Sequence, residues 1–186
     1  MSIPRPSDPA RLVVGAFTAE KELFPEAVSA VTGLFGPLDA ASPWFSFHHT
    51  SYYNDEMGGP LFRRLVSFKK LVDQGDLADI KLSTNRLESS WLAPSGGRRI
   101  NLDPGYLTPE RFVLATGKNY IHRIYLLKGI YADLTLVYRQ GGYEPLFWTY
   151  PDYAEEGIRG FLLRLRSGLL AARRKDAPEP CLGVSV

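Results

Sequence analysis

The sequence predicts an α+β protein: a single mixed or antiparallel sheet with a ferredoxin-like β-α-β-β-α-β order, followed by a C-terminal strand–helix extension. Two observations predict this class. Short apolar runs, typical of strands, alternate with stretches whose apolar residues recur at spacings of three and four, which is typical of helices. The chain has 186 residues, which is enough for one domain with a buried core and short for two.

The expected strands are short apolar and aromatic runs, several of them bounded by glycine or proline. They cover residues 11–17, 44–48, 61–68, 99–103, 122–125, 130–138 and 143–148. The fourth strand should end at Pro104 and Gly105, and the short link between the second and third predicts a hairpin.

Four helices are expected. The first has its apolar face between residues 24 and 35, and the second carries an apolar stripe over residues 77–91. Thr108-Pro109-Glu110 predicts the start of a short third helix, because a capping hydroxyl precedes a proline at the first helical position. The spacing from Asp152 to Glu155 predicts that Asp152 is the N-cap of the last helix.

Composition limits the class of protein. Residues 1–10, with three prolines, are expected to form a flexible arm, residues 11–175 one domain and residues 176–186 a flexible tail. The net charge of +2 gives no global field for nucleic acid or membranes, and the one cysteine, Cys181, excludes an internal disulfide and a four-cysteine zinc site. Without an apolar leader or spanning segment, we expect a cytoplasmic protein with no membrane partner.

The common catalytic and cofactor signatures are absent. The sequence has no phosphate-binding P-loop, no dinucleotide-binding glycine motif after a strand, no serine nucleophile elbow and no H-E-x-x-H zinc motif. His48 and His49 are adjacent on an expected strand, so they should point to opposite faces and not share a metal ion. The sequence therefore predicts no metal site and identifies no cofactor.

From Leu12 to about Tyr153 the chain resembles an uncharacterised family, domain of unknown function 4416. The resemblance rests on these stretches: 50–53, 56–58, 77–88, 99–107, 122–126, 129–133 and 148–153. Some members of this family carry a GTP-binding label, but this sequence has no P-loop that would support it. The resemblance therefore implies membership of a family and no specific activity.

The hairpin around Lys128-Gly129 offers the sharpest candidate site. A two-residue turn would place Leu126 opposite Tyr131, Ile124 opposite Asp133 and His122 opposite Thr135. His122 and Asp133 would then be diagonal neighbours on one face and could act as an acid/base pair. A three-residue turn would separate them, and a solvent-facing strand with scattered polar residues is the alternative interpretation.

Other polar residues gather in the stretches that carry the resemblance. Asp103 and Tyr106 follow the expected end of a strand, although Asp103 could simply cap a turn. Lys81, Asn85 and Glu88 lie on one side of the second helix, which is also typical of a hydrated face. The complete set of candidate ligand contacts is Lys81, Asn85, Asp103, Tyr106, Lys118, His122, Arg123 and Asp133.

These residues favour a binding protein or enzyme for an anionic small molecule, phosphorylated or nucleotide-like. A single-stranded nucleic-acid-binding module is the second hypothesis, with bases stacked on aromatic side chains of the sheet and phosphates held by flanking arginines. Its candidate residues are Tyr120, Tyr125, Tyr131, Trp148, Arg63, Arg64 and Arg123. A scaffold without a ligand is the third, and the sequence leaves the reaction and the oligomeric state open.

Overall fold

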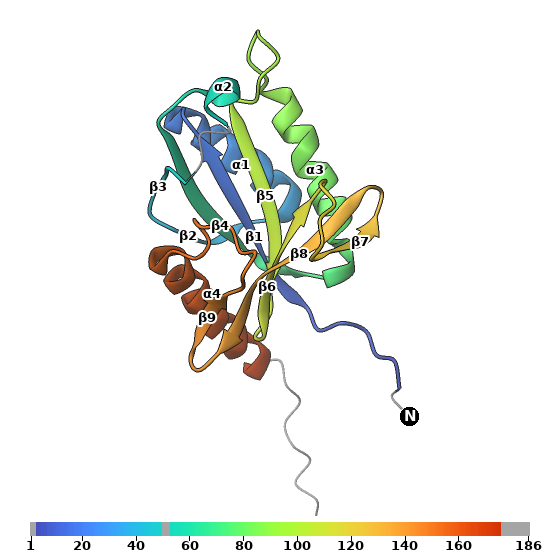
Figure 1. Ribbon diagram of the computed structural model, residues 1–186. Coiled ribbons are helices and arrows are strands. Elements are labelled where there is room, and N and C mark those ends of the chain that lie inside the picture. Colours follow the sequence, from blue (N-terminus) through green and yellow to red (C-terminus); the bar gives the residue numbers. More distant parts are fainter. Residues whose placement is uncertain (1–2, 50–52, 176–186) are drawn as a thin grey trace, which may run out of the picture.

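The computed structural model describes residues 3–49 and 53–175 (Figure 1). The tail predicted for residues 176–186 lies outside this part of the chain. Within it, the strands and helices are β1 (Ala10–Thr18), α1 (Phe24–Phe35), β2 (Leu38–Ala41), β3 (Phe45–Phe47), α2 (Asn54–Met57), β4 (Leu61–Val72), α3 (Leu77–Ser90), β5 (Ile100–Leu107), β6 (Arg111–Thr116), β7 (Arg123–Leu127), β8 (Ile130–Arg139), β9 (Gly142–Pro145) and α4 (Glu156–Lys175).

The strands of the described residues form one open antiparallel sheet, so the prediction of an α+β fold with a single sheet is confirmed. The order is β2-β4-β1-β5-β6-β8-β7, with β3 paired to β4 and β9 paired to β8. A ferredoxin-like order for the whole sheet is not confirmed, because the nine strands extend past β5 through β6, β8 and β7. The short strand β2 was not expected from the sequence.

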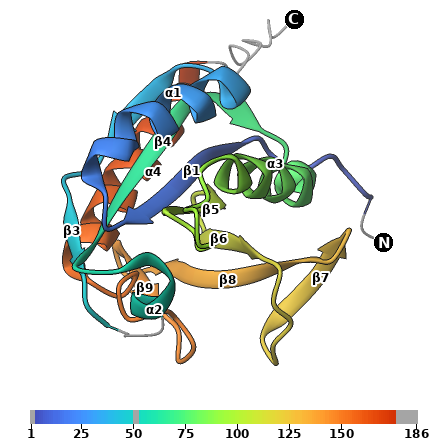
Figure 2. The ribbon, with the colours of Figure 1, turned by 90° about the horizontal axis from the view of Figure 1, so that it is seen from above.

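The two faces of the sheet are covered by different helices, which explains why β1 is buried along its whole length. Leu12 and Val14 pack with residues of α1 and α3 in one buried cluster. Val13 points to the opposite face, where it packs with Ile158 and Leu162 of α4. Figure 2 shows α1 beside β4 and α3 beside β5. A strand buried on both faces has no polar alternation, as its sequence shows.

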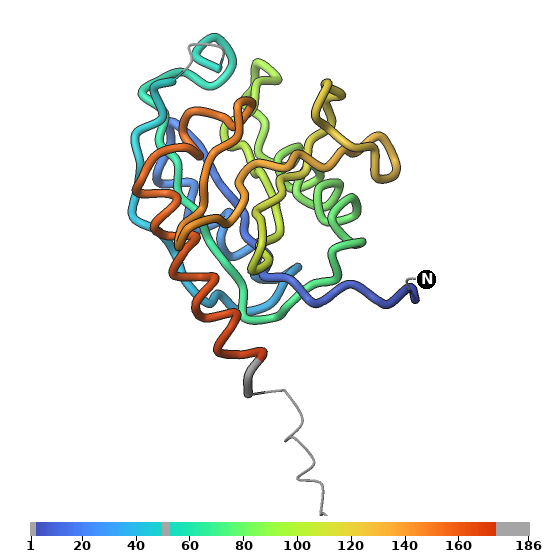
Figure 3. The backbone as a smooth tube through the Cα atoms, turned by 60° about the horizontal axis from the view of Figure 1, so that its bottom comes forward, coloured from blue at the N-terminus to red at the C-terminus, as the bar shows by residue number. Residues whose placement is uncertain are grey.

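The hairpin of β7 and β8 projects from the body on the side away from α4 (Figure 3). Its turn has Lys128 at φ 55° and Gly129 at φ 79°, both in the left-handed region that a two-residue hairpin requires. The predicted two-residue turn is therefore confirmed. None of the described helices is both long and apolar enough to cross a membrane.

The predicted third helix is wrong, because residues 111–116 form the strand β6. Thr108-Pro109-Glu110 makes the turn of a β5–β6 hairpin, in which the Thr108 N–H donates to the Arg111 carbonyl. Proline suits the second position of a β-turn as well as the first turn of a helix, so the local signal was ambiguous. The apolar run of β6, buried between β5 and β8, decided the outcome.

The predicted end of the fourth strand at Pro104 is also wrong, since β5 continues to Leu107. Gly105 lies where β5 meets β6, and a Cβ atom there would stand 2.5 Å from the Val113 carbonyl oxygen. Proline ends strands because it lacks an N–H for the neighbouring strand. Pro104 is tolerated because β5 has no strand neighbour beside it on that side.

Asp152 is not the N-cap of the last helix. The helix α4 begins at Glu156, and Asp152 is a buried residue that faces Arg63 across the molecule. The strand expected at residues 143–148 is shorter, because β9 ends at Pro145. The loop between Pro145 and Glu156 instead turns back over the sheet and supplies side chains to the cavity described below.

Candidate functional site

A large cavity opens where β5 and β6 separate. The two strands pair only from Gly105 to Leu107 on β5 and from Phe112 to Leu114 on β6. Figure 1 shows β5 and β8 spreading apart beyond this point. The cavity has a volume of about 720 Å³ and is lined by Phe47, His49, Tyr53, Arg63, Lys81, Asn85, Glu88, Arg98, Asn101, Asp103, Leu114, Ala115, Thr116, Gly117, Lys118, Asp133, Tyr150, Pro151, Asp152 and Tyr153.

Two charged side chains of α3 replace the missing strand neighbour of β5. The Lys81 ammonium donates to the Leu102 carbonyl over 2.8 Å, and the Leu102 N–H donates to Glu88 Oε1 over 2.7 Å. These bonds satisfy both backbone groups of Leu102 on the side away from β1. Pro104, two residues further, presents its nitrogen to the same side, where no donor is needed.

Lys81 and Glu88 also form a buried ion pair. Their charged atoms lie 3.7 Å apart, and the Lys81 ammonium lies 3.8 Å from Asp103 Oδ1. Burial raises the pKa of Glu88 above its usual value, while Lys81 acts in the opposite direction. The hydrated helix face considered from the sequence is therefore wrong, since both side chains are less than a tenth exposed.

Arg63 of β4 lies at the floor of the cavity, in a buried group with Tyr153 and Asp152 and beside the partly exposed Asp103. Its Nη1 donates to the Tyr153 hydroxyl over 2.8 Å, and its Nε lies 2.8 Å from Asp152 Oδ2. Asp103 is 3.5 Å from its Nη2. Gly15 makes room for this group, because a Cβ atom there would stand 2.7 Å from the Tyr153 hydroxyl.

The electrostatics of this group keep Arg63 charged. Burial alone would lower the pKa of Arg63, but Tyr153, Asp152 and Asp103 outweigh burial and raise it. Burial in turn raises the pKa of the Tyr153 hydroxyl, which therefore stays protonated at neutral pH. The guanidinium also lies over the rings of Phe17, 5.0 Å from its centroid, and of Tyr153, at 4.8 Å.

Asp133 of β8 forms the opposite wall and is held from behind by the β7 hairpin. Its Oδ2 accepts from Arg123 Nε over 2.8 Å and lies 3.2 Å from His122 Nε2. The His122 ring stacks on Trp148 with centroids 4.9 Å apart, and Arg123 Nη2 donates to the Tyr150 hydroxyl over 2.6 Å. The predicted contact between His122 and Asp133 is confirmed, and the alternative of a solvent-facing Asp133 is wrong, since it is 2% exposed.

The register that predicted this contact is nevertheless wrong. Arg123, and not Ile124, lies opposite Asp133, and Tyr125 lies opposite Tyr131. An irregularity between Tyr125 and Leu127 inserts one extra residue and shifts the ladder. His122 lies just before β7 and reaches Asp133 from the loop.

Arg98, Lys118 and His49 border the cavity nearer to solvent. Arg98 Nε donates to Glu56 Oε1 over 2.7 Å, and this hydrogen bond lowers the pKa of Glu56. Arg98 Nη1 also donates to Asn101 Oδ1 over 2.6 Å. The lining holds four cationic side chains (Arg63, Lys81, Arg98, Lys118) and four carboxylates (Glu88, Asp103, Asp133, Asp152), so its formal charge is balanced.

Five of the eight candidate ligand contacts line the cavity: Lys81, Asn85, Asp103, Lys118 and Asp133. His122 and Arg123 lie behind Asp133 and support it. Tyr106 lies elsewhere, against the apolar cluster that contains Leu77 and Val113.

The sequence analysis named none of Arg98, Asn101 and Asp152 as a ligand contact, and it named Arg63 only for the nucleic-acid hypothesis. For Asn101 and Asp152 there was a signal, because both lie in stretches that carry the family resemblance. Arg63 had none, because it stands in an apolar strand next to a second arginine and only the fold shows which of the two is buried.

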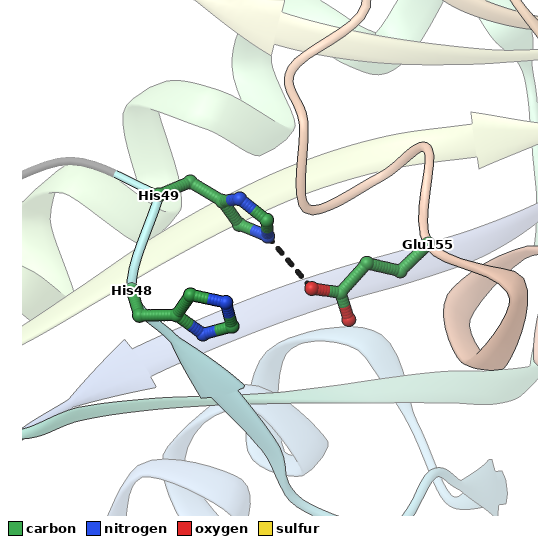
Figure 4. Close-up of side chains that lie close together, drawn as sticks. All are labelled: His48, His49 and Glu155. Carbon is green, nitrogen blue, oxygen red and sulfur yellow. Dashed lines mark hydrogen bonds and ion pairs between the residues drawn. The ribbon is translucent and has the colours of Figure 1, made fainter.

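His48 and His49 do not point to opposite faces, contrary to the sequence prediction. The strand β3 ends at Phe47, so the alternation of a strand no longer applies, and the two rings stack with centroids 4.6 Å apart. Figure 4 shows both rings on the side of Glu155, whose Oε1 lies 2.7 Å from His49 Nε2.

Comparison with known proteins places the chain in a family without describing a reaction. No curated protein and no solved structure matches the chain. A family model does match, over residues 8–168, which is most of the sequence and includes every element that lines the cavity. The chain therefore belongs to the family described as domain of unknown function, DUF4416.

Proposed function

We propose that the cavity between β5 and β6 binds a small molecule that carries an anionic group, phosphorylated or nucleotide-like. The observation that carries this proposal is the convergence of cationic, amide and aromatic side chains from β3, β4, α3, β5 and several connecting loops on one cavity of about 720 Å³. Ligand sites are usually concave spaces of roughly this size with a few convergent polar groups.

The balanced charge of the lining restricts the class of ligand that the cavity can bind. Arg63 and Lys81 are already paired with carboxylates, so a bare polyanion would meet as many like charges as opposite ones. A ligand with one anionic group and several hydrogen-bonding groups fits better. The anionic group would lie near Lys118 and Arg98, at the solvent side of the cavity, with Arg98 keeping its ion pair with Glu56. The amides of Asn85 and Asn101 would take the uncharged polar groups.

Aromatic side chains add a surface for a flat ring. Tyr53, Tyr150 and Phe47 line the cavity, and Phe47 and Tyr53 are in ring contact at 6.1 Å. A purine or pyrimidine base could stack there while its phosphate reaches the cationic side chains. A nucleoside monophosphate therefore combines the groups that the lining can satisfy.

Asp133 and His122 take different roles in this proposal. Asp133 lines the cavity and can contact the ligand directly. The His122 side chain is 6% exposed and lies behind Asp133, so it positions this carboxylate and does not touch the ligand. If the bound molecule reacts, Asp133 and Asp103, which both line the cavity, are the carboxylates that we propose to take part.

The test is calorimetric titration of the protein with nucleoside monophosphates, the corresponding nucleosides and sugar phosphates. We expect a nucleoside monophosphate to bind and to raise the free energy of unfolding by about 2.7 kcal/mol at 100 times its dissociation constant. Lys118→Ala and Asn85→Ala should weaken binding, whereas Lys69→Ala should not, because Lys69 is an exposed cation of β4 outside the cavity. If no compound of the panel binds, a scaffold without a ligand becomes the better interpretation.

A single-stranded nucleic-acid-binding module stays the second candidate, supported by the exposed rings of Tyr125 on β7 and of Tyr120 in the loop before it. Two of its three arginines count against it: Arg63 is buried and paired, and Arg64 is hydrogen-bonded to the Ser42 carbonyl. A salt titration against unstructured oligonucleotides separates the candidates, since phosphate contacts weaken steeply with salt.

We further propose that the N-terminal half of the fold keeps a ferredoxin-like arrangement. The neighbours β2-β4-β1-β5, with α1 and α3 on the same face, support this. The strands β6 to β9 and α4 would then be an addition to this half, and the cavity lies at the junction of the two parts.

A further inference from the structure

Beside the cavity, three potential metal ligands come from two distant segments of the chain. His48 and His49 directly follow β3, and Glu155 lies in the loop before α4, more than a hundred residues later. One ligand atom from each side chain lies within 4.8 Å of the others (Figure 4). The tertiary structure therefore assembles a group of two imidazoles and one carboxylate that the sequence does not suggest.

The backbone explains how adjacent histidines serve one site. After Phe47 the chain leaves the strand β3, so His48 and His49 no longer alternate between two faces, and their rings lie 27° from parallel. His49 Nε2 and Glu155 Oε1 are already 2.7 Å apart. This contact orients the carboxylate toward the two rings before any ion binds.

The chemistry of the three groups selects the kind of ion. Imidazole nitrogens favour first-row transition ions such as Zn²⁺, Ni²⁺ and Co²⁺, whereas Mg²⁺ and Ca²⁺ favour sites made of oxygen atoms. Two imidazoles and one carboxylate are also the protein ligands of several catalytic zinc sites, which keep a further position open.

We propose that His48, His49 and Glu155 bind a divalent transition-metal ion, with Zn²⁺ as the reference ion, at the rim of the cavity. His49 lines the cavity and is also exposed, so it stands where the cavity meets solvent. An ion held there keeps an open coordination position beside the cavity. The site does not depend on the ligand proposed above, because metal binding can be measured alone.

At this position the ion would also supply positive charge for an anionic ligand group, which the paired cations of the cavity interior supply only in part. The cations Arg63 and Lys81 are paired with carboxylates in the interior. A divalent ion at the rim adds positive charge that these carboxylates do not neutralise directly. An anionic ligand group could then complete its coordination shell.

The experiment uses the full chain with Cys181→Ser, so that the thiol contributes nothing, and titrates Zn²⁺ and Co²⁺ by calorimetry. We expect one ion per chain. His48→Ala, His49→Ala and Glu155→Gln should each weaken binding at least about tenfold, because even the loss of a group that only orients a metal ligand costs about this much. Glu156→Gln is the matched control, because Glu156 is an exposed neighbour at the start of α4, and it should bind like the parent.

A second measurement reports on the ligands directly. The chain has three histidines, so nitrogen NMR of labelled imidazoles should show His48 and His49 shifting on addition of Zn²⁺ while His122 does not. Thermal unfolding of each variant checks that the fold is retained. No binding at millimolar Zn²⁺, or parent-like binding by both His48→Ala and Glu155→Gln, overturns the proposal.

Discussion

The two ends of β5 satisfy the backbone hydrogen-bonding groups on the side away from β1 in different ways. At the Gly105 end, β5 pairs with β6, and the backbones approach so closely that only glycine fits. At the Leu102 end, the two strands have separated, and the side chains of Lys81 and Glu88 make the hydrogen bonds that a strand would make. Both ends satisfy the backbone, but only the second leaves space for a cavity.

The difference shows what a buried ion pair can contribute to a fold. A strand neighbour would satisfy Leu102 at lower electrostatic cost, since burying charges is expensive even when they are paired. The pair instead keeps polar side chains and open space beside β5. The charged residues of α3 therefore connect the stability of the sheet to the presence of the cavity, and variants at the two ends can test this connection.

The largest effect is expected at the open end. Lys81→Met leaves the buried Glu88 carboxylate with only the more distant Arg98, 4.0 Å away, and the Leu102 carbonyl without its donor. The free energy of unfolding in urea should fall by about 4 kcal/mol. The double variant Lys81→Met/Glu88→Leu should recover part of this loss, because no uncompensated charge remains. A loss below about 1 kcal/mol, the range of exposed pairs, would show that the pair does not support β5.

The closed end should give the next largest effect. Gly105→Ala places a Cβ atom 2.5 Å from the Val113 carbonyl oxygen, so β5 and β6 must move apart. We expect a loss of about 3 kcal/mol in the same urea experiment. Gly117→Ala is the control within the same cavity wall, because its added Cβ would meet no atom within 4 Å. Equal effects of the two substitutions would contradict the close approach of the strands.

A third prediction concerns the pH dependence of the open end. The pKa of Glu88 is raised above 4.5, chiefly by burial, so the folded state holds this proton more tightly than the unfolded state does. The resulting stabilisation is complete below pH 4.5, and it is lost as the pH rises through the pKa that Glu88 has in the folded state. The parent should therefore gain stability relative to Glu88→Gln as pH falls from neutral toward 4.5, measured by thermal unfolding. If the difference in stability between the parent and Glu88→Gln stays constant across this pH range, burial does not raise the pKa of Glu88.

The smallest effect is expected for an ion pair outside both ends. Lys128 and Asp79 lie 2.6 Å apart, but their side chains are 52% and 62% exposed. Lys128→Met should change the free energy of unfolding by less than about 0.5 kcal/mol, because solvent screens the pair. A loss comparable to that of Lys81→Met would mean that burial is not what distinguishes the two lysines.

The sequence alone determined the elements whose signals are local and agree with each other. The apolar run of β1, the amphipathic spacing of α1 and α3, and the glycine turn after Lys128 each predicted the observed structure. The stretches resembling the family identified it, and they contain eleven of the residues that line the cavity. The contact of His122 with Asp133 was also predicted, although the register behind that prediction was wrong.

Only the tertiary structure decided the features in which a local signal has two outcomes. Thr108-Pro109-Glu110 can start a helix or make a β-turn, and burial of β6 between β5 and β8 selected the turn. Pro104 could stay in a strand because separation of β5 from β6 removed the need for its N–H. Arg63 became the buried centre of the cavity floor through Tyr153 and Asp152, 90 residues away in the case of Tyr153. Such contacts depend on which segments the sheet brings together, and no local pattern encodes that choice.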